Sequence, residues 1–480
     1  MSEDRPNILI LCTDQQRFSA MGAYGNPEIH TPHLDRLAEQ GTLFENTYVQ
    51  SPVCAPSRAS LMTGRYVHSH GLWANGVALP PQEKLFTREL ADAGYDCGLV
   101  GKLHLAPCQG GRTEERRDDG FRVFRWAHDP YPGSSENSYH RWLRARHPIL
   151  YTSAMDPEDP LDFNTMPTEA HFSRWIGDET IDFLTTDRQT DRPFCFIANF
   201  FDPHHGFGAP EEHIDRYDPD ALSRPVTKED ELSTKPPIYT EASKKSYGGH
   251  ARGYTDYTAE ELQETKTAYY AMVTLVDDEV GRILQTLESE GLEEDTIVVF
   301  TSDHGEMLGD HQLMLKGPMM YEEAVRVPLL VRWPAQVPSQ ERRSELVSWI
   351  DLAPTLLDAA GAAPNSEHQG DSLLPMLRQE EPWQRDWALC EYRNSGHPYD
   401  PPVETTMLRQ DRWKIVVHHG DPVTSRPRTG ELYDLVEDPK ELTNLWGSSS
   451  HRDTRLALQE QLLDVIVSTE DRRQTRVADW

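Results

Sequence analysis

The sequence predicts an α/β fold: a large, mixed but mostly parallel sheet flanked by helices, then a small C-terminal antiparallel sheet with a helix. Continuous apolar runs at 7–13, 194–200 and 296–302 are typical of strands buried on both faces. Segments with helical periodicity separate these runs. Because 480 residues exceed one ordinary domain, we predict a large domain at 1–375 and a smaller α+β domain at 376–480.

Strands and helices alternate along the large domain. After the first strand, helices are predicted at 31–41, directly after residue 54 and at 88–93, strands at 95–105, 194–200 and 296–302, and a long helix at 258–290. Thr31 is the expected cap of the first helix and Gly41 its terminator. A capping box of Thr258 and Glu261 is expected to start the long helix. Ligands of such sheets gather beyond the carboxyl ends of the strands, so polar residues there become site candidates.

The character of the sequence changes past about residue 375. Short strands joined by polar turns are predicted at 387–392, 406–409, 413–417 and 431–435, with a terminal helix at 454–467. Two polar, proline-rich stretches, 108–167 and 210–257, interrupt the alternation in the large domain. We interpret both as long functional loops.

Composition excludes several classes of protein. The formal net charge of −32 argues against nucleic acid and against an anionic membrane surface as partners. No stretch reaches the roughly 20 apolar residues that span a bilayer. The six cysteines are scattered, as expected of reduced thiols, and residues 1–6 lack the features of a signal peptide. We therefore expect a cytoplasmic protein, or a periplasmic or secreted one if a leader was trimmed.

The most informative segment runs from Cys54 to Arg58, Cys-Ala-Pro-Ser-Arg, and continues into a short apolar stretch that ends at Gly64. This pattern resembles the signature of the type I sulfatases, which belong to the alkaline phosphatase superfamily. An ordinary buried cysteine before a helix is the alternative, and it would be favoured for an isolated C-x-P-x-R. The resemblance covers most of the chain, including 22–25, 101–104, 303–330 and 431–445, and weakens in the two long loops.

The resemblance implies a nucleophile and a reaction. In the family the cysteine is oxidised to formylglycine by a maturing enzyme, and one hydroxyl of the hydrated aldehyde attacks sulfur. The second hydroxyl later expels sulfate. Cys54 would be the precursor of this group, and Arg58, one helical turn away, would hold the diol and counter its charge. The implied fold is alkaline-phosphatase-like, which agrees with the α/β pattern.

Two strand tips carry the predicted metal ligands. By resemblance, the metal set is Asp14, Gln15, Asp303 and His304, together with the modified Cys54. Oxygen ligands favour calcium, and the imidazole shifts the balance toward manganese, so we expect one divalent ion, with Ca²⁺ preferred and Mn²⁺ the alternative. The commonest sulfatase pattern is Asp-Asp and Asp-Asn. Asp14-Gln15 and Asp303-His304 instead resemble the choline sulfatase and phosphonate monoester hydrolase branches.

Cationic and acidic groups complete the predicted site. Lys102 and His104 follow Gly101 like the G-K-x-H segment of sulfatases, and the resemblance implies that both are catalytic residues that contact the sulfate and the leaving oxygen. Alternation along a strand would place both side chains on one face. Lys316 resembles the lysine that bridges the sulfate and the leaving oxygen. His204 is the candidate general acid, and His205 could share or replace it.

Further residues are candidates for binding the substrate: Asn75, His205, His311, Arg393 and His397. Asn75 matches an asparagine of the two branches with the Asp-His pattern, although a turn Asn before Gly explains it almost equally well. Arg393 and His397 lie in a Gly- and Pro-containing loop that could reach over the pocket, and a surface turn explains that loop equally well.

The sequence therefore predicts a sulfuric ester hydrolase that acts on a sulfated carbohydrate or a small alkyl or aryl sulfate. The alternative is a phosphonate monoester hydrolase or phosphodiesterase with the same nucleophile, which Lys102, His104 and Lys316 disfavour. Choline-O-sulfate would need an aromatic or acidic cage, for which Trp126, Tyr131 and Trp142 are available. A non-catalytic, anion-binding relative is a third reading. The leaving group and the oligomeric state, including a homo-oligomer, stay open.

Overall fold

The computed structural model describes residues 5–109, 111–131, 133–156, 158–159, 161–363, 365–420 and 427–471. Residues 1–4, on which the expectation about a leader partly rests, lie outside this set, as do residues 472–480 of the predicted second domain. Within the described residues, no helix has the length and apolar character needed to cross a membrane.

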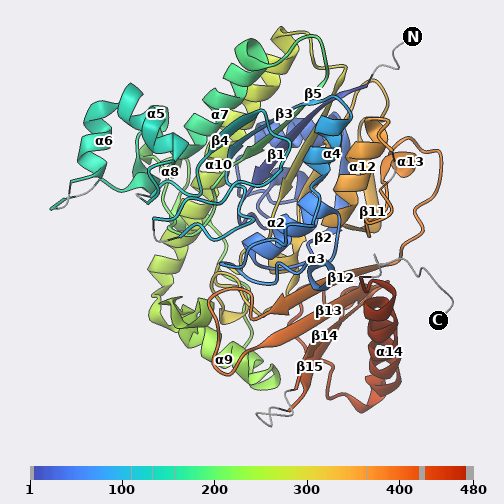
Figure 1. The fold of residues 1–480 in the computed structure, drawn as a ribbon. Helices are drawn as coiled ribbons and strands as arrows, with labels where there is room; N and C mark the ends of the chain where they lie inside the picture. Colours follow the sequence, from blue (N-terminus) through green and yellow to red (C-terminus); the bar gives the residue numbers. More distant parts are fainter. Residues whose placement is uncertain are drawn as a thin grey trace.

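A nine-stranded sheet forms the centre of the molecule (Figure 1). Its strands are β1 (Asn7–Thr13), β2 (Thr42–Tyr48), β3 (Asp96–Gly101), β4 (Val123–Trp126), β5 (Phe194–Asn199), β8 (Thr296–Ser302), β9 (Arg326–Val327), β10 (Leu329–Arg332) and β11 (Glu341–Ser348). The order is β11-β2-β10-β8-β1-β5-β3-β4, with β9 beside β2. β10 runs antiparallel to both β8 and β2, whereas the block from β8 to β4 is parallel, which confirms the predicted mostly parallel sheet.

Both faces of the sheet are covered by helices, as the apolar strands predict. Along β1, Ile8 and Ile10 pack into a cluster with residues of α2 (Cys54–Thr63), α4 (Phe86–Asp92) and α12 (Leu352–Ala359). Leu9 and Leu11 alternate with them and pack on the other face, against α1 (Pro32–Glu39), α7 (Phe172–Asp182) and α10 (Ala259–Ser289). The two helical layers are visible on either side of the strands in Figure 1.

Helix starts follow the sequence with one correction. Thr258 and Glu261 form the predicted capping box of α10. Thr31 occupies the cap position of α1, but its hydroxyl does not bond the backbone of the helix. Instead, the carboxylate of Asp277, on α10, accepts hydrogen bonds from the backbone N–H groups of His33 (3.1 Å) and Leu34 (2.7 Å). A distant acid therefore takes the role expected of Thr31.

The strand predicted at 95–105 is shorter than expected. β3 ends at Gly101, whose φ of +95° leaves the extended region, and His104 has a φ of +63°. A side chain at 101 would meet the carbonyl oxygen of Asn199 at 2.1 Å. The expectation that Lys102 and His104 alternate onto one strand face is therefore wrong, because both lie in the turn that follows β3.

The two proline-rich stretches are not simple loops. The first contains β4 and two helices, α5 (Ser138–Arg146) and α6 (Pro148–Ala154). The second contains α8 (Glu211–Ile214), α9 (Pro237–Lys244) and a two-stranded ribbon, β6 (Lys245–Ser246) and β7 (Ala251–Arg252). Other short helices are α3 (Val67–His70), α11 (Glu322–Val325) and α13 (Leu374–Leu377).

A separate four-stranded antiparallel sheet follows, in the order β12-β13-β14-β15. Its strands are β12 (Trp387–Arg393), β13 (Glu404–Gln410), β14 (Trp413–His418) and β15 (Thr429–Asp434), and α14 (Arg452–Ser468) packs against it. This confirms the predicted small sheet with a helix; the domain boundary at 375 stays a prediction.

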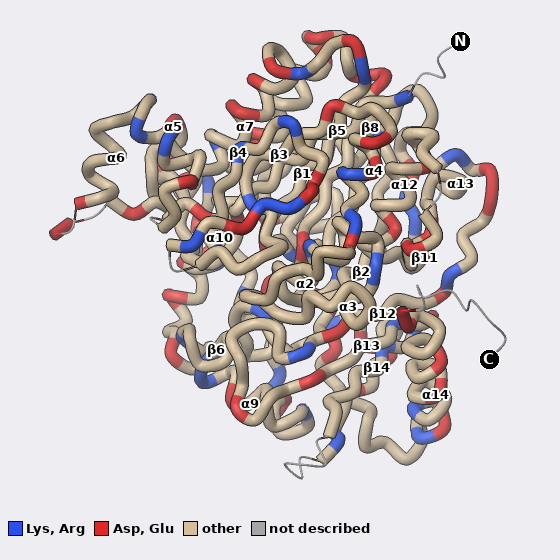
Figure 2. Tube along the Cα trace, in the orientation of Figure 1, with Lys and Arg blue, Asp and Glu red and all other residues tan. Residues whose placement is uncertain are grey.

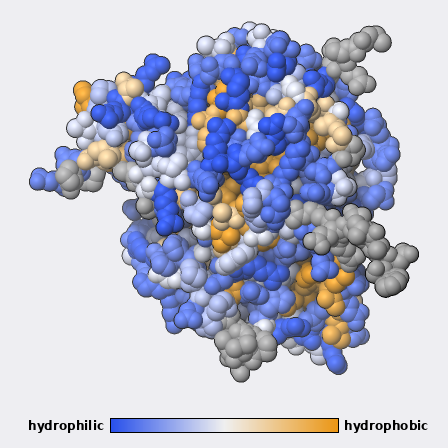
Figure 3. All heavy atoms as spheres, in the orientation of Figure 1, coloured by the Kyte–Doolittle hydropathy of each residue, from blue (hydrophilic) through white to orange (hydrophobic). Residues whose placement is uncertain are grey.

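Basic and acidic residues are interspersed along the chain (Figure 2), and apolar residues gather on the surface over α14 (Figure 3).

Candidate active site

Polar residues converge where the strands of the large sheet end. Asp14 follows β1, Asp303 and His304 follow β8, Lys102 follows β3, and β5 leads into the segment that carries His204. Cys54 begins α2, after the chain leaves β2. The parallel strands bring these segments to one edge of the sheet, as expected of an open α/β sheet.

Cys54 lies at the first turn of α2 and is buried. Its Sγ is 3.1 Å from Nε2 of His304 and 3.0 Å from Nζ of Lys316. Burial and Asp14 raise the pKa of this thiol, but Lys102, Lys316 and His304 outweigh them, so its pKa lies below the ordinary value. The helix N-terminus also favours a negative charge at this position.

Two buried carboxylates face the cysteine, and cations hold both. Oδ2 of Asp303 accepts a hydrogen bond from Nε of Arg58 at 2.8 Å. Oδ2 of Asp14 accepts from Nζ of Lys102 at 2.7 Å and from the Arg58 guanidinium at 3.3 Å. Asp14, Cys54, Asp303 and His304 each offer a ligand atom within 4.8 Å of the others. This donor set, with two carboxylates and one imidazole, fits a divalent cation.

Lys316 is central to the polar network. Besides Cys54, its ammonium lies 3.1 Å from Nε2 of His304 and donates to Oε1 of Gln15 at 2.8 Å. Burial alone would lower the pKa of Lys316, but Cys54, Asp14 and Asp303 raise it above the ordinary value. Lys316 is therefore a permanently charged group in the substrate-free site.

Glu306 bonds both Gln15 and the segment that carries Lys316, and the sequence interpretation missed this residue. Its carboxylate accepts hydrogen bonds from the backbone N–H groups of Leu308 (2.9 Å) and Leu315 (2.6 Å), and it bonds the amide of Gln15. Glu306 is fully buried. It fixes both Gln15 and the residue before Lys316, and its position three residues after Asp303 was the available signal.

His204 and His205 stack on each other with ring centroids 3.9 Å apart. Nδ1 of His205 lies 3.2 Å from Oε1 of Gln15, which links the pair to Lys316. Burial lowers the pKa of His204 well below its usual range, and His205 and Lys316 lower it further. The His204 ring is therefore neutral at pH 7 before an anion enters.

A pocket of about 250 Å³ opens beside this network. Asn75, His104, Tyr247 and His397 are among its lining residues. Asn75 accepts a hydrogen bond from the Ala55 backbone N–H at the start of α2 (3.1 Å) and donates to the Tyr247 hydroxyl (3.1 Å). Asn75 therefore connects the pocket to the helix that carries Cys54.

Tyr247 is a second residue that sequence reasoning missed. It follows β6 within a stretch interpreted as a loop, and its ring lies 5.8 Å from Nζ of Lys316. His397 packs edge-to-face on this ring at 4.8 Å and stacks on His250 at 3.7 Å. The structure thus brings His397 to the pocket, whereas nothing in the composition of 210–257 singles out Tyr247.

The structure does not bring two of the predicted substrate-binding residues to this pocket. His311 stacks on Tyr321 at 3.8 Å, and its Nδ1 is 2.6 Å from a carboxylate oxygen of Glu231. Arg393 pairs with Glu391 at 2.5 Å, at the end of β12. Both side chains contact carboxylates among the described residues, and their part in substrate binding stays a prediction.

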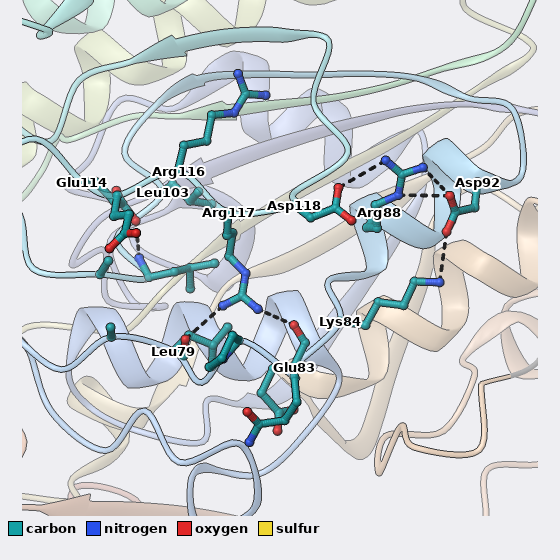
Figure 4. Close-up of a pocket in the computed structure, with 16 residues that line it drawn as sticks. Leu79, Glu83, Lys84, Arg88, Asp92, Leu103, Glu114, Arg116, Arg117 and Asp118 are labelled. Atoms are coloured by element: carbon teal, nitrogen blue, oxygen red, sulfur yellow. Dashed lines mark hydrogen bonds and ion pairs between the residues drawn. The ribbon is translucent and has the colours of Figure 1, made fainter.

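A larger cavity of about 1030 Å³ adjoins the segment that carries His104 (Figure 4). Figure 4 shows that its cations are engaged: Arg88 reaches Asp92 and Asp118, Lys84 reaches Asp92, and Arg117 reaches carbonyl oxygens. Arg116, the fourth cation of the lining, binds Asp119. Among the described residues, these four cations therefore all have partners. The smaller pocket is the better candidate for the substrate, because its lining residue Tyr247 lies beside Lys316.

The match to known proteins decides the family. A model of the sulfatase family matches residues 6–362, and a model of the N-sulphoglucosamine sulphohydrolase C-terminal region matches residues 309–468. The chain belongs to the sulfatase family. It is a sulfuric ester hydrolase with an alkaline-phosphatase-like fold, which confirms the reading from the Cys54 segment.

Three relatives are similar along nearly the whole chain. An N-acetylglucosamine-6-O-sulfatase of Bacteroides thetaiotaomicron is 27% identical, over 95% of this chain and 86% of that protein. A choline-sulfatase of Rhizobium meliloti is 28% identical, over 93% of this chain and 83% of that protein. The crystal structure of a phosphonate monoester hydrolase of Agrobacterium radiobacter superposes with a TM-score of 0.83 at 27% identity, covering 99% and 98% of the two chains.

Proposed function

We propose that this sulfatase hydrolyses an organic O-sulfate ester, with an oxidised Cys54 as nucleophile and one divalent cation, in a pocket suited to an uncharged or anionic alcohol such as a sulfated sugar. The observation that carries this proposal is the cluster of Cys54, Arg58, Lys102 and Lys316 around two buried carboxylates. Three cations in one water-poor site favour an anionic substrate group.

The donor set supports the metal and the modification. Asp14, Asp303 and His304 would hold the cation, with Gln15 as a further predicted ligand, and their hard oxygens favour Ca²⁺ over Mn²⁺. When bound, the cation would polarise the sulfate oxygens and the nucleophile. Formylglycine at Cys54 would supply a geminal diol, which a maturing enzyme must install.

The other side chains have distinct tasks in this proposal. Arg58 and Lys102 fix Asp14 and Asp303 and offset their charge, so that the acids do not repel the sulfate. Lys316 presents its ammonium to the sulfate, and His204 gives a proton to the departing oxygen. Since His204 is neutral in the free protein, the bound anion must raise its pKa before it can act as an acid.

The pocket lining narrows the substrate class. It consists of Asn75, Gly76, His104, Pro107, Cys108, Gln109, Arg112, Tyr247, Gly396, His397 and Pro398. This set contains no carboxylate, although the chain has 79 acidic residues against 47 basic ones.

A quaternary ammonium group would need acids or an aromatic cage. Trp126 instead bonds Glu114, Tyr131 bonds Asn164, and Trp142 stacks on Tyr139. The lining therefore disfavours choline-O-sulfate.

A phosphonate monoester or phosphodiester substrate is the second candidate. The structural match to the hydrolase of Agrobacterium radiobacter favours it, together with Asp303-His304 and the position of Asn75 beside α2. Lys102 and His104 count against it, because the resemblance places hydroxyl residues there in that branch. The two candidates share a nucleophile and differ in the transferred group.

The deciding measurement is kcat/KM for matched aryl sulfate and aryl phosphonate esters. It uses protein in which peptide mass confirms formylglycine at position 54, with Cys54→Ala as the control. We expect a strong preference for the sulfate that disappears in the control. A preference for the phosphonate would replace the sulfatase proposal by the second candidate, and no turnover of either ester or of a sulfated sugar would favour the non-catalytic reading.

A further inference from the structure

A second cluster of metal-binding side chains lies beside the proposed sulfate site. His104, Cys108 and His128 each offer a ligand atom within 4.8 Å of the others. Sγ of Cys108 is 3.1 Å from Nδ1 of His128, and the rings of His104 and His128 pack edge-to-face at 4.6 Å. One thiol and two imidazoles are a soft donor set, unlike the carboxylate-rich set around Cys54.

The geometry suits zinc. In a tetrahedral site with Zn–S of about 2.3 Å and Zn–N of about 2.0 Å, neighbouring ligand atoms lie ~3.3–3.6 Å apart. The contact between Cys108 and His128 is already near that value, and the remaining separations need only small side-chain rotations. Nδ1 of His104 is buried and has no hydrogen-bond partner, so one ligand position is unsatisfied without a metal.

The surroundings supply the usual outer partners of a metal site. If His128 uses Nδ1 as the ligand atom, its Nε2 lies 3.9 Å from a carboxylate oxygen of Asp129, which is near enough for an ion pair but longer than a hydrogen bond. The Glu114 carboxylate accepts a hydrogen bond from the backbone N–H of His104 at 2.9 Å and so fixes the turn that carries this ligand. His104 and Cys108 also line the 250 Å³ pocket, which gives an ion a route in.

We propose that His104, Cys108 and His128 form an inhibitory site for a soft divalent ion of the zinc class. On binding, the thiol of Cys108 loses its proton to solvent and its sulfur donates an electron pair to the ion, while both imidazoles bind in the neutral form. Water would fill the fourth position, on the side of the pocket. The ion would then keep His104 from the contact with the sulfate group that the family resemblance implies for it, so the ion and the substrate would exclude each other; this last step rests on the proposed function.

Binding is tested without reference to activity. Cobalt(II) replaces zinc as the probe, because thiolate–cobalt charge transfer absorbs in the near ultraviolet. The parent is Cys54→Ala, which removes the other thiol able to reach a metal at this edge of the sheet. We expect a thiolate–cobalt band in the parent, and its loss in Cys108→Ser and weakening in His128→Gln. Cys97→Ala, which removes a buried thiol of β3, should keep the band.

Inhibition is measured on active protein with calcium in excess. Zinc should inhibit the wild type. In Cys108→Ser, the zinc concentration that halves the rate measured without zinc should be more than about 100-fold higher than in the wild type. This follows because losing even an outer partner weakens metal sites about 10- to 100-fold. Absence of the cobalt band in the parent would overturn the site, whatever the activity shows. A band without zinc inhibition would uphold the site and overturn its link to His104 in the reaction.

Discussion

In the proposed reaction Lys316 and His204 serve the leaving oxygen, and their charge states in the free protein differ. Lys316 is charged because Cys54, Asp14 and Asp303 raise its pKa, whereas burial and neighbouring cations keep His204 neutral in the free protein. A neutral ring acquires its proton only after an anion is bound. Under the proposed function, Lys316 would therefore stabilise charge throughout the reaction, and His204 would act when the bond to the leaving oxygen breaks.

This division predicts a dependence on the leaving group. His204→Ala should reduce kcat/KM by about 10²- to 10⁴-fold for an alkyl sulfate, the usual contribution of a general acid, and much less for a nitrophenyl sulfate that leaves unaided. Lys316→Ala should impair both esters similarly, because charge is lost on the sulfate itself. Rates over a series of phenols test this. Equal losses of both esters in His204→Ala would assign the proton to another group.

Glu306 provides a prediction about positioning. Glu306→Ala leaves the buried N–H groups of Leu308 and Leu315 without their acceptor, each at a cost of about 1–3 kcal/mol, and frees Gln15. We expect a lower denaturation midpoint and a lower kcat with little change in KM, because Lys316 would lose its fixed position. Glu306→Gln, which keeps one acceptor oxygen, should recover part of both. A Glu306→Ala variant with normal kcat would show that Lys316 keeps its position without Glu306.

At the scale of elements, the sequence was sufficient where pattern and burial agree. Strands at 7–13 and 296–302 and the long helix at 258–290 appear with nearly the predicted bounds, because uninterrupted apolar runs and a capping box are local signals. Short strands such as β9, which pairs with β2, and β10, which lies between β2 and β8, have no such signal. The ribbon that presents Tyr247 and the cap of α1 by Asp277 depend on contacts between distant segments.

The same distinction applies to the site. Cys54, Asp14, Asp303 and Lys316 could be found because strand ends and a family motif mark them. The orientation of His104 could not, because a positive φ after Gly101 turns the chain out of the strand. The contacts of His311 could not be predicted for the same kind of reason: its neighbours in sequence belong to the motif, but its side chain contacts Glu231 and Tyr321.

Gly101 permits a test of this turn. Gly101→Ala combines an unfavourable φ of +95° with a contact of 2.1 Å to the Asn199 carbonyl oxygen, so the turn that carries Lys102 must move. The matched control is Gly25→Ala, with a φ of +91° and nothing within 4 Å of the added carbon. The control should lose about 1–2 kcal/mol of stability from backbone strain alone. Gly101→Ala should lose more and also lose activity. Similar stability and kcat in the two variants would contradict the argument.

At the scale of the whole molecule, a buried charge cluster joins the two sheets. Lys414, on β14 of the small sheet, binds Glu322 of α11 at 3.0 Å and Glu441 at 2.5 Å. Glu322 begins α11, six residues after Lys316, and also accepts a hydrogen bond from Tyr48 on β2. An ion pair therefore links the small sheet to the segment that follows Lys316.

This cluster predicts how the stability of the protein depends on pH in the acid range. Burial alone would raise the pKa of Glu322, but Lys414, Arg326 and Arg409 outweigh it and lower the pKa to about 2, from an ordinary value of 4.5. A carboxyl with a lowered folded pKa contributes stability that is complete above 4.5 and lost as the pH falls toward 2. Urea midpoints of the wild type should therefore drop across this window.

Glu322→Gln should flatten that part of the acid dependence, whereas Glu380→Gln, at an exposed position, should leave it unchanged. Lys414→Met at pH 7 should cost about 3–5 kcal/mol, because it removes the buried cation that Glu322 and Glu441 share, and adding Glu322→Gln should recover much of that loss by removing one of the two negative charges. If Lys414→Met unfolds like the wild type, the cluster does not join the sheets. If it is destabilised and kcat also falls, then the small sheet holds Lys316 in place as well as covering the large domain.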